Sequence, residues 1–548
     1  MLLCAALSLT AAFAQPSAVK KAANAVFTLT TYDKDGEVMA TSRGAFVGAN
    51  GEAVALWTPF VGASRAEVVD AKGQKHEVQA MIGANELYDV CKFRVEGRTT
   101  PMRLGTQAQN GGAKVWVPYV ADGKVKGQQL TVEKNEPFMQ KYSYYIFADP
   151  VGDDLYGSAV VDESGALLAL LQSAQTSTDA HATDVHLLDT VCTTGLSLND
   201  AVLRQTGIRV DLPADKDQAA LLLMMSSEQS DSLRRVQYID DFVRLFPKAV
   251  DGYVARAQNL MDACDYDGAR REMQVAQKTV DDKADAHAEW SRLMYQQLML
   301  NTDSTFNKWT LDDALAEAQK AYAINAQPAY RHREAQIVFS KADYAKAYDM
   351  FIELTKTPLR NGELYYEAAQ CKTHLKAPDT EILALLDSAV AACPKPLTNL
   401  SAPYVLARGQ MLDAAGQQRL ALKDYNLYDS LMLGRASATF YYTRYQCEMK
   451  VRQYQQALND IAHAALLSPQ QPLYVAELAS LQLRVNRYED AVKAADICLQ
   501  MAPDNSDSYI IKGLALIQLK KKEEGMAALA KAKELGDARA DDLMKKYK

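Results

Sequence analysis

The chain has 548 residues, of which 48% are hydrophobic and 23% charged, and its formal net charge at pH 7 is −8. These fractions are ordinary for a globular chain and exclude wholesale disorder. The acidic balance argues against a general nucleic-acid binder, because affinity for phosphate depends on Lys and Arg. At roughly 150 residues per domain, the length allows three or four domains, or fewer domains joined to an array of repeats.

The chain begins with an apolar segment. Residues 2–11 are almost all apolar, and Ala12-Phe13-Ala14 before Gln15 matches a small-x-small cleavage site. This pattern predicts a secretory signal peptide over residues 1–14, and hence a periplasmic or secreted protein. A buried N-terminal helix is the alternative, and because no positive charge precedes the apolar run, the true start stays open. No later window reaches ~18 uninterrupted apolar residues, so we expect no membrane-spanning helix.

The sequence offers no pattern for a cofactor. Of the eight cysteines, Cys4 lies in the predicted leader, and the others form no C-x-x-C pair and lie at no zinc spacing from a histidine. Most of them fall on apolar faces, so we predict core thiols. No P-loop, H-E-x-x-H, EF-hand or dinucleotide-binding motif occurs in its required context. We therefore expect no metal, nucleotide or other cofactor.

Residues 25–173 show short strands separated by turn signals. Segments such as AVFTLTTY, YDVCKFRVE and YSYYIFAD are rich in β-branched and aromatic residues. The intervening turns contain residues that tolerate positive φ, at Asp35-Gly36, Asn50-Gly51, Lys72-Gly73 and Ser164-Gly165. Roughly ten short strands without a helical period between them predict a β-barrel or sandwich.

From about residue 214 the pattern changes to that of helices with a longer repeat. Three sets of positions recur every 34 residues, namely Ala457, Ala491 and Gly525; Ala464, Cys498 and Ala532; and Pro469 and Pro503. Small residues at such positions let two helices cross closely, and the proline ends the second helix. This step is the signature of the tetratricopeptide (TPR) repeat and predicts an all-α superhelical solenoid.

The same template extends upstream with variable spacing. Small-residue pairs 12 positions apart occur at Ala257 and Ala269, Ala335 and Ala347, and Gly409 and Ala421. About eight or nine helix pairs are expected, each burying its core only against its neighbours. The predicted organisation is a signal peptide (1–14), a β-barrel domain (25–173), a connector (174–213) and TPR-like helical repeats (214–548).

About residues 42–190 resemble the trypsin-like serine proteases, in particular their HtrA-type members. The resemblance is carried by RGAFVGANGEAVALWTPFVGA, YDVCKFRVEG, PMRLGT and DPVGDDLYGSAVVDESGALLALL. In that family these stretches hold, in turn, the catalytic His after a strand, the Asp before a strand, a surface-strand marker and the nucleophile loop. The resemblance implies an all-β trypsin-like double barrel.

Carried over position by position, the resemblance implies that all three catalytic roles are lost. The His position falls on Thr58, the Asp position on Leu87, with Asp89 two residues later, and the Ser position on Tyr156. Thr is no proton acceptor near neutral pH and Leu cannot orient an imidazole. A Tyr phenol with a pKa of ~10 is a poor acyl nucleophile without an activating base. We predict no catalytic residues and a degenerate protease domain.

Ser158 is the fallback nucleophile, because a two-residue slip of the alignment would place it at the Ser position. A Ser nucleophile needs a base, and the candidate histidines His76, His181 and His186 lie at positions without a role in the family. Cys91 lies within an apolar strand and Cys192 in the predicted connector. The structural interpretation of these residues is therefore preferred to a working triad.

In TPR proteins the first helices of successive repeats line the concave surface, and some members bind a peptide carboxylate there through Lys, Arg and Asn. The corresponding positions here are His332, Arg333, Gln336, Phe339, Tyr365, Tyr366, Lys372, Gln410, Asp413, Tyr442, Thr443, Gln446, Glu477, Ser480 and Leu483. This surface is rich in Tyr and Gln and lacks the stacked Lys and Asn set. Aromatic side chains with a polar tip suit an extended peptide or a partner helix. Packing between repeats is the alternative for each Tyr, and a carbohydrate ligand stays open.

Three functions remain on this basis. The first is an exported, non-catalytic interaction scaffold that combines a pseudoprotease barrel with a TPR solenoid binding a protein or peptide. The second is a diverged serine peptidase that recruits substrates through its repeats, and the third is a chaperone-like binder of envelope proteins. The missing His favours the first.

Overall fold

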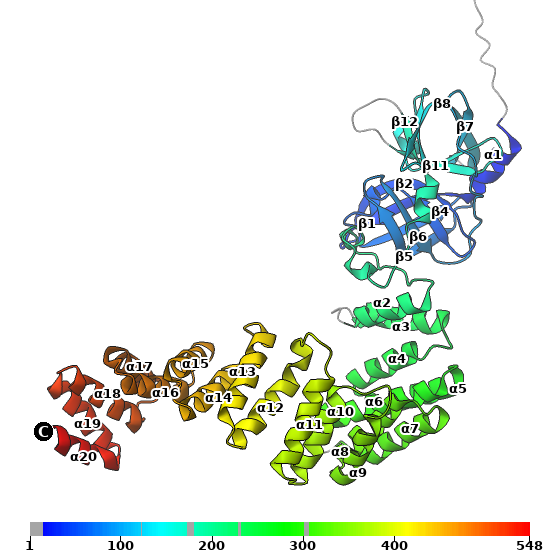
Figure 1. The fold of residues 1–548 in the computed structure, drawn as a ribbon. Coiled ribbons are helices and arrows are strands. Elements are labelled where there is room, and N and C mark those ends of the chain that lie inside the picture. The colour runs from blue at the N-terminus through cyan, green and yellow to red at the C-terminus, as the bar shows by residue number, and fades with distance from the viewer. Residues whose placement is uncertain (1–14, 122, 173–179, 228–231, 301–305) are drawn as a thin grey trace, which may run out of the picture. The chain divides into compact units, whose positions relative to one another are not determined.

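The computed structural model describes residues 15–121, 123–172, 180–227, 232–300 and 306–548. The signal peptide predicted over residues 1–14 lies outside this range. Two closed β-barrels are followed by helices (Figure 1), which confirms the predicted fold class of a β-barrel domain and an all-α solenoid. The chain divides into two compact units, Met1–Ala286 and His287–Lys548.

The first barrel closes six antiparallel strands in the order β1-β2-β3-β6-β5-β4. Its strands are β1 (Val26–Tyr32), β2 (Val38–Phe46), β3 (Glu52–Ala55), β4 (Arg65–Asp70), β5 (Lys75–Asn85) and β6 (Val90–Val95). Inward-facing aromatic rings fill it, since the Phe27 ring centroid lies 4.7 Å from that of Phe46 and 6.0 Å from that of Phe93. The predicted turn residues Gly36, Gly51, Gly73 and Gly165 all have φ between +75° and +85°.

The second barrel repeats this topology in the order β10-β11-β12-β9-β8-β7. Its strands are β7 (Lys114–Ala121), β8 (Lys124–Phe138), β9 (Tyr142–Phe147), β10 (Ala159–Val161), β11 (Leu167–Gln172) and β12 (Ala180–Asp184). β12 lies inside segment 174–213, which we expected to be a connector. It pairs with both β9 and β11, so the second barrel closes only with this strand and extends past residue 173.

The two barrels share a hydrophobic core at their junction. Val54 and Val90 of the first barrel pack in one cluster with Trp116 and Leu170 of the second, together with Val19 of the short helix α1 (Ser17–Ala22). A second contact joins loop 86–89 to the other barrel, where the Tyr88 and Phe138 ring centroids are 4.5 Å apart. The barrels are therefore held as one body.

The first helices of the chain belong to the barrel unit. They are α2 (Lys216–Ser226), α3 (Ser232–Leu245), α4 (Asp251–Asp262) and α5 (Tyr266–Thr279). Leu222 of α2 and Phe242 of α3 share a buried cluster with Phe93 of the first barrel. The predicted change to helices near residue 214 is close to the start of α2 at Lys216, and the boundary between the two compact units lies further along the chain, at Ala286.

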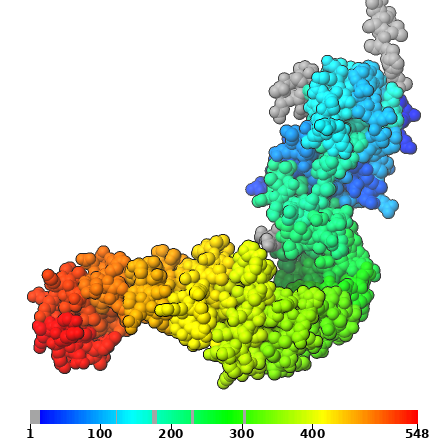
Figure 2. Space-filling model, in the orientation of Figure 1, coloured from blue at the N-terminus to red at the C-terminus, as the bar shows by residue number. Residues whose placement is uncertain are grey.

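The second unit is entirely helical in its described residues. In the space-filling view, the colours of this unit follow the chain order from green to red (Figure 2). Its helices are α6 (Lys283–Leu300, which begins in the first unit), α7 (Leu311–Ile324), α8 (Pro328–Ser340), α9 (Tyr344–Leu354), α10 (Gly362–His374), α11 (Asp379–Ala392), α12 (Ala402–Ala414), α13 (Gln418–Met432), α14 (Ala438–Lys450), α15 (Tyr454–Leu467), α16 (Pro472–Arg484), α17 (Tyr488–Met501), α18 (Ser506–Gln518), α19 (Lys522–Glu534) and α20 (Ala538–Tyr547). A short 3-10 turn, Asn399–Ser401, precedes α12.

The predicted 34-residue step is a step of helix pairs. α14, α16 and α18 begin at residues 438, 472 and 506, and α15, α17 and α19 begin at residues 454, 488 and 522. Ala457 and Ala491 at the crossing positions are fully buried. The turn inside each pair places Arg452, Asn486 and Lys520 in the left-handed region, with φ of +61°, +62° and +64°. Sequence period and backbone geometry therefore agree.

The prediction of core thiols holds for five cysteines and not for two. Cys91, Cys371, Cys393, Cys447 and Cys498 are buried and unbridged, whereas Cys192 and Cys264 are exposed. Cys264 lies in the turn between α4 and α5 with a φ of +60°, which places its side chain outside the helix packing. Within the described ranges, no helix is both long and apolar enough to cross a membrane.

Candidate functional site

The residue at the family's His position, Thr58, is bound to a carboxylate of the first barrel. Thr58 opens a 3-10 turn, Thr58–Phe60, after β3, and Asp89 lies in the turn between β5 and β6. The Thr58 backbone N–H and hydroxyl both donate to Asp89 Oδ1, at 2.6 and 2.9 Å. The group that faces Thr58 is thus Asp89, and the two residues contact each other directly, with no imidazole of the described residues between them.

Leu87, to which we assigned the Asp position, points away from this contact. Its side chain is 81% exposed, because it occupies the outer part of the turn, while Asp89 turns back with a φ of +47°. The assignment of the family's Asp position to Leu87 stays a prediction, and the carboxylate that contacts Thr58 is that of Asp89. Burial raises the pKa of Asp89, and the hydrogen bonds from Thr58 oppose this shift.

The loop at the family's Ser position is pressed against β2. A Cβ on Gly157 would lie 2.6 Å from the carbonyl oxygen of Arg43, and Gly157 has a φ of +84°. The Arg43 guanidinium bonds the carbonyl of Asp154 and lies 3.6 Å from its carboxylate. Tyr156, half-buried, directs its carbonyl toward the Ser42 hydroxyl at 3.5 Å. The loop is held as a structural element.

Ser158, the fallback nucleophile, is enclosed. It is 2% exposed, and its Oγ has no hydrogen-bond partner among the described residues. A catalytic serine needs a base within hydrogen-bond reach and an open path to substrate. Ser158 has neither in this arrangement.

The three candidate histidines are engaged elsewhere in the two barrels. His76 Nδ1 lies 2.9 Å from the carbonyl oxygen of Glu96, and the His181 ring stacks on Tyr144 at 5.6 Å. His186 Nδ1 lies 2.7 Å from Asp184 Oδ1 beside a cavity of about 240 Å³.

Cys91 is unsuited to nucleophilic chemistry. It is fully buried, its thiol approaches the carbonyl oxygen of Leu56 at 3.4 Å, and burial raises its pKa well above the ordinary value. Because the thiolate is the nucleophile, this side chain is an inert core thiol.

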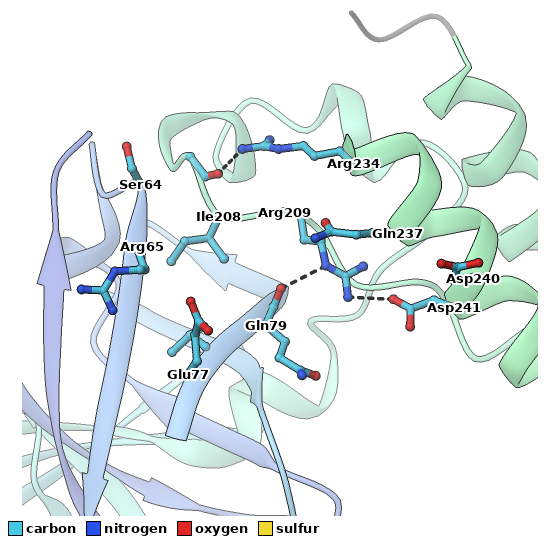
Figure 3. A pocket seen from close by; sticks show the side chains of 12 residues that line it. Ser64, Arg65, Glu77, Gln79, Ile208, Arg209, Arg234, Gln237, Asp240 and Asp241 are labelled. Carbon is cyan, nitrogen blue, oxygen red and sulfur yellow. Dashed lines mark hydrogen bonds and ion pairs between the residues drawn. The ribbon is translucent and has the colours of Figure 1, made fainter. Parts of the chain in front are cut away.

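A polar cavity of about 430 Å³ lies where the first barrel meets α3 (Figure 3). Arg209 spans it, since its Nε donates to the carbonyl of Gln79 at 3.1 Å and its Nη2 lies 2.7 Å from Asp241. Arg234 of α3 donates to the carbonyl of Gly207. The pictured side chains thus join α3 to the barrel, and no sequence pattern had pointed to them.

The second unit contains a cavity of about 400 Å³ between α6, α8, α9 and α10. It is lined by Tyr295, Arg333, Gln336, Phe339, Phe351, Tyr366, Glu367 and Gln370. The structure therefore brings together Arg333, Gln336 and Tyr366 from the predicted binding set. Tyr295, Phe351 and Glu367 were missed, because their helices are joined by irregular segments that break the 34-residue step.

A chain of hydrogen bonds crosses one wall of this cavity. Arg333 Nη1 donates to Gln336 Oε1 at 2.8 Å, and Gln336 Nε2 donates to Glu367 Oε1 at 2.8 Å. His332 Nε2 lies 2.6 Å from Glu367 Oε2. Together with Glu363, His332 and Glu367 form a group whose ligand atoms lie within 4.8 Å of one another. His332 and Glu367 already have hydrogen-bond partners in one another and in Gln336, so these residues form a hydrogen-bonded cluster.

The other predicted binding residues lie outside the cavity. Tyr365 is half-buried with the Arg360 guanidinium 5.8 Å from its ring. Tyr442 packs between Tyr445 and Tyr474, with ring centroids 5.8 and 5.1 Å away. Gln410 and Gln446 are exposed. The Tyr442 contacts are those of packing between neighbouring helices.

Comparisons with known proteins find only distant structural similarity, and this similarity is to proteases. No protein-family model and no curated protein matches the sequence. The chain is similar to the solved structure of the HtrA-type protease AlgW with tripeptide, at 17% identity and a TM-score of 0.28, over 31% of this chain and 59% of that one. It is also similar to the Rv3671c protease of M. tuberculosis in its active form, at 13% identity and a TM-score of 0.29, over 36% and 86%. Similarity at this level carries no argument about activity. What fits a trypsin-like double barrel is the pair of closed six-stranded barrels.

Proposed function

We propose that this chain is a non-catalytic scaffold for protein–protein interaction, in which a pseudoprotease double barrel is joined to a TPR-like helical array. The observation that carries the proposal is the pair of hydrogen bonds from Thr58 to Asp89 Oδ1. This carboxylate faces a threonine where a protease would need an imidazole, so the described residues place no histidine at Asp89 to activate a nucleophile. The enclosed Ser158 supports the same conclusion.

Binding is assigned to the helical unit. The 34-residue step of helix pairs supports TPR-like repeats, which present their first helices to a ligand as a continuous surface. The partner is a protein or peptide, since the exposed Gln410 and Gln446 and the half-buried tyrosines provide polar and aromatic contacts. We propose neither nucleic acid as a partner nor insertion into a membrane.

The site of action is outside the cytoplasm, in the periplasm or secreted. The apolar run and small-x-small motif of residues 1–14 support this part of the proposal. An assembly in that compartment is the natural setting for a scaffold whose helical unit binds a partner.

Site-specific photo-crosslinking in living cells tests the scaffold function. A benzophenone amino acid replaces Gln446 on α14, a first helix of its pair, or Leu466 on α15, the second helix, which is 76% exposed. We expect discrete adducts with a protein partner from position 446 and none from position 466. Equal adducts from positions 446 and 466 would contradict the proposed surface. The absence of adducts from both position 446 and a second probe at Gln410 would also contradict it.

A further inference from the structure

Arg333 lines an aromatic cavity and forms no ion pair with a carboxylate among the described residues. It lies on α8 and is half-buried. Its one hydrogen bond to a described residue is from Nη1 to Gln336 Oε1, and no described carboxylate forms an ion pair with it. Its Nε and Nη2, the two donors that form a side-on fork, have no described acceptor.

The nearby carboxylates are already occupied. Glu367 accepts from Gln336 and pairs with His332, and Glu289 pairs with Arg292 at 2.6 Å. Burial lowers the pKa of Arg333 and Arg292 adds to that shift, while Tyr295, Glu289 and Glu367 oppose it only in part. Because a charge that is partly removed from water and has no ion-pair partner loses hydration, an anionic ligand would stabilise this guanidinium.

The remaining walls are mostly aromatic, and Glu367 and Gln370 are the polar residues among them. The Arg333 guanidinium lies 5.5 Å from the centroid of the Tyr295 ring, and Phe339, Phe351 and Tyr366 complete the lining. The Tyr295 hydroxyl is 2.8 Å from Ser340 Oγ, so this ring presents its face to the cavity while its polar tip is engaged elsewhere. A volume of about 400 Å³ is that of a small-ligand site with few convergent polar groups.

We propose that this cavity binds an apolar carboxylate, whose two oxygens accept from Arg333 Nε and Nη2 and whose hydrocarbon or aromatic body lies on the surrounding rings. A fork of this kind matches the planar carboxylate. A phosphate dianion fits less well, because its larger negative charge would lie near Glu367, which lines the same cavity. The Gln336 amide N–H already donates to Glu367 and is not free to bind further phosphate oxygens. The cavity belongs to the helical unit to which protein binding is assigned above, but the acid titration and the photo-crosslinking test the two proposals separately.

Calorimetric titration of the full mature chain tests it, with 3-phenylpropionate as the probe and 3-phenylpropan-1-ol as the neutral analogue. We expect saturable binding of the acid and roughly tenfold or greater weakening for the alcohol, since a hydrogen bond to a charged group contributes that much. Arg333→Gln should weaken acid binding by a similar factor. Arg360→Gln removes an exposed guanidinium of the same unit and should bind as the wild type does.

Arg333→Lys keeps the charge without the fork, so an intermediate affinity is expected from a variant that preserves the packing. The peptide acetyl-Gly-Gly-Phe, with a free carboxylate or as its amide, distinguishes the source of the ligand. Tighter binding of the peptide acid assigns the cavity to a chain terminus, and tighter binding of 3-phenylpropionate assigns it to a free acid. Acid binding that Arg333→Gln leaves unchanged, or no saturable binding of either acid, overturns the proposal.

Discussion

At the scale of single residues, Asp89 and Ser158 of the two barrels differ in whether their polar groups have hydrogen-bond partners among the described residues. Asp89 satisfies the backbone N–H and the hydroxyl of Thr58, whereas Ser158 is buried with an unpaired hydroxyl. A buried hydroxyl without a hydrogen-bond partner lowers the free energy of unfolding, whereas a hydrogen-bonded one raises it slightly. The two kinds of residue should therefore respond differently to removal of the hydroxyl.

Ser158→Ala should leave the free energy of unfolding unchanged or raise it by up to about 1 kcal/mol, because no hydrogen bond is lost. The control is Thr206→Val in the same unit, whose hydroxyl donates to the carbonyl of Ala63 and accepts from the N–H of Ile208. That variant should lose about 1–2 kcal/mol. Urea unfolding measures both. A destabilised Ser158→Ala would show that Ser158 has a partner in solution.

Glu448 on α14 gives a prediction about pH. It is 4% exposed, and burial raises its pKa to about 8, with Asp460 adding to the shift and Arg444 opposing it. Between the ordinary pKa of 4.5 and about 8 the native state holds a proton that the unfolded chain has lost. Stability should consequently fall as the pH rises through this window.

Glu448→Gln removes this titration, so the variant should be more stable than the wild type by about 1–3 kcal/mol above pH 8, with the gain vanishing near pH 4. Denaturant midpoints between pH 4 and 9 measure the difference, with the exposed Glu489→Gln as the control. Parallel pH profiles for Glu448→Gln and the wild type would contradict the burial of this carboxyl.

At the scale of elements, the sequence period determined the helix pairs better than it determined the barrels. The 34-residue step fixes where α14 to α19 begin, because each repeat has the same local constraints at residues such as Ala457 and Ala491.

Strand β12 was missed, because five residues are too few to show a pattern and its place depends on pairing with β9. The contact of Asp89 with Thr58 could not be predicted, because residue spacing does not reveal the left-handed turn at Asp89. Tyr295 and Glu367 meet only after α6, α8 and α10 have packed.

The contact between Gly157, in the loop at the predicted Ser position, and strand β2 can be tested by substitution. Gly157→Ala should cost about 2–4 kcal/mol, since it adds both the positive-φ penalty and a clash with the Arg43 carbonyl. Gly36→Ala has the same φ penalty, at +83°, but nothing within 4 Å, and should cost only about 1 kcal/mol. Equal losses in thermal unfolding would show that the loop does not rest on β2.

At the scale of the whole molecule, the two compact units have separate cores. Phe93 belongs to the cluster that joins the first barrel to α2 and α3, and Ile461 to a cluster formed by α12 to α16. Both side chains are fully buried. Units with separate cores unfold as separate cooperative transitions.

Calorimetry should resolve two transitions, and each core variant should move one of them. Phe93→Ala and Ile461→Ala are each expected to cost about 2–5 kcal/mol, the first lowering only the transition of the barrel unit and the second only that of the helical unit. A single transition, or one in which both variants shift both steps equally, would contradict the division at Ala286.

Covalent labelling with a fluorophosphonate serine-hydrolase probe tests the central claim most directly. The mature wild-type chain, Ser158→Ala and a heat-unfolded sample are treated side by side with an active trypsin-like protease as the positive control. With Asp89 bound to Thr58 and Ser158 enclosed, the native chain should label no more than the unfolded one. Labelling of the native wild type that disappears in Ser158→Ala would show a working nucleophile and contradict the account of a non-catalytic barrel.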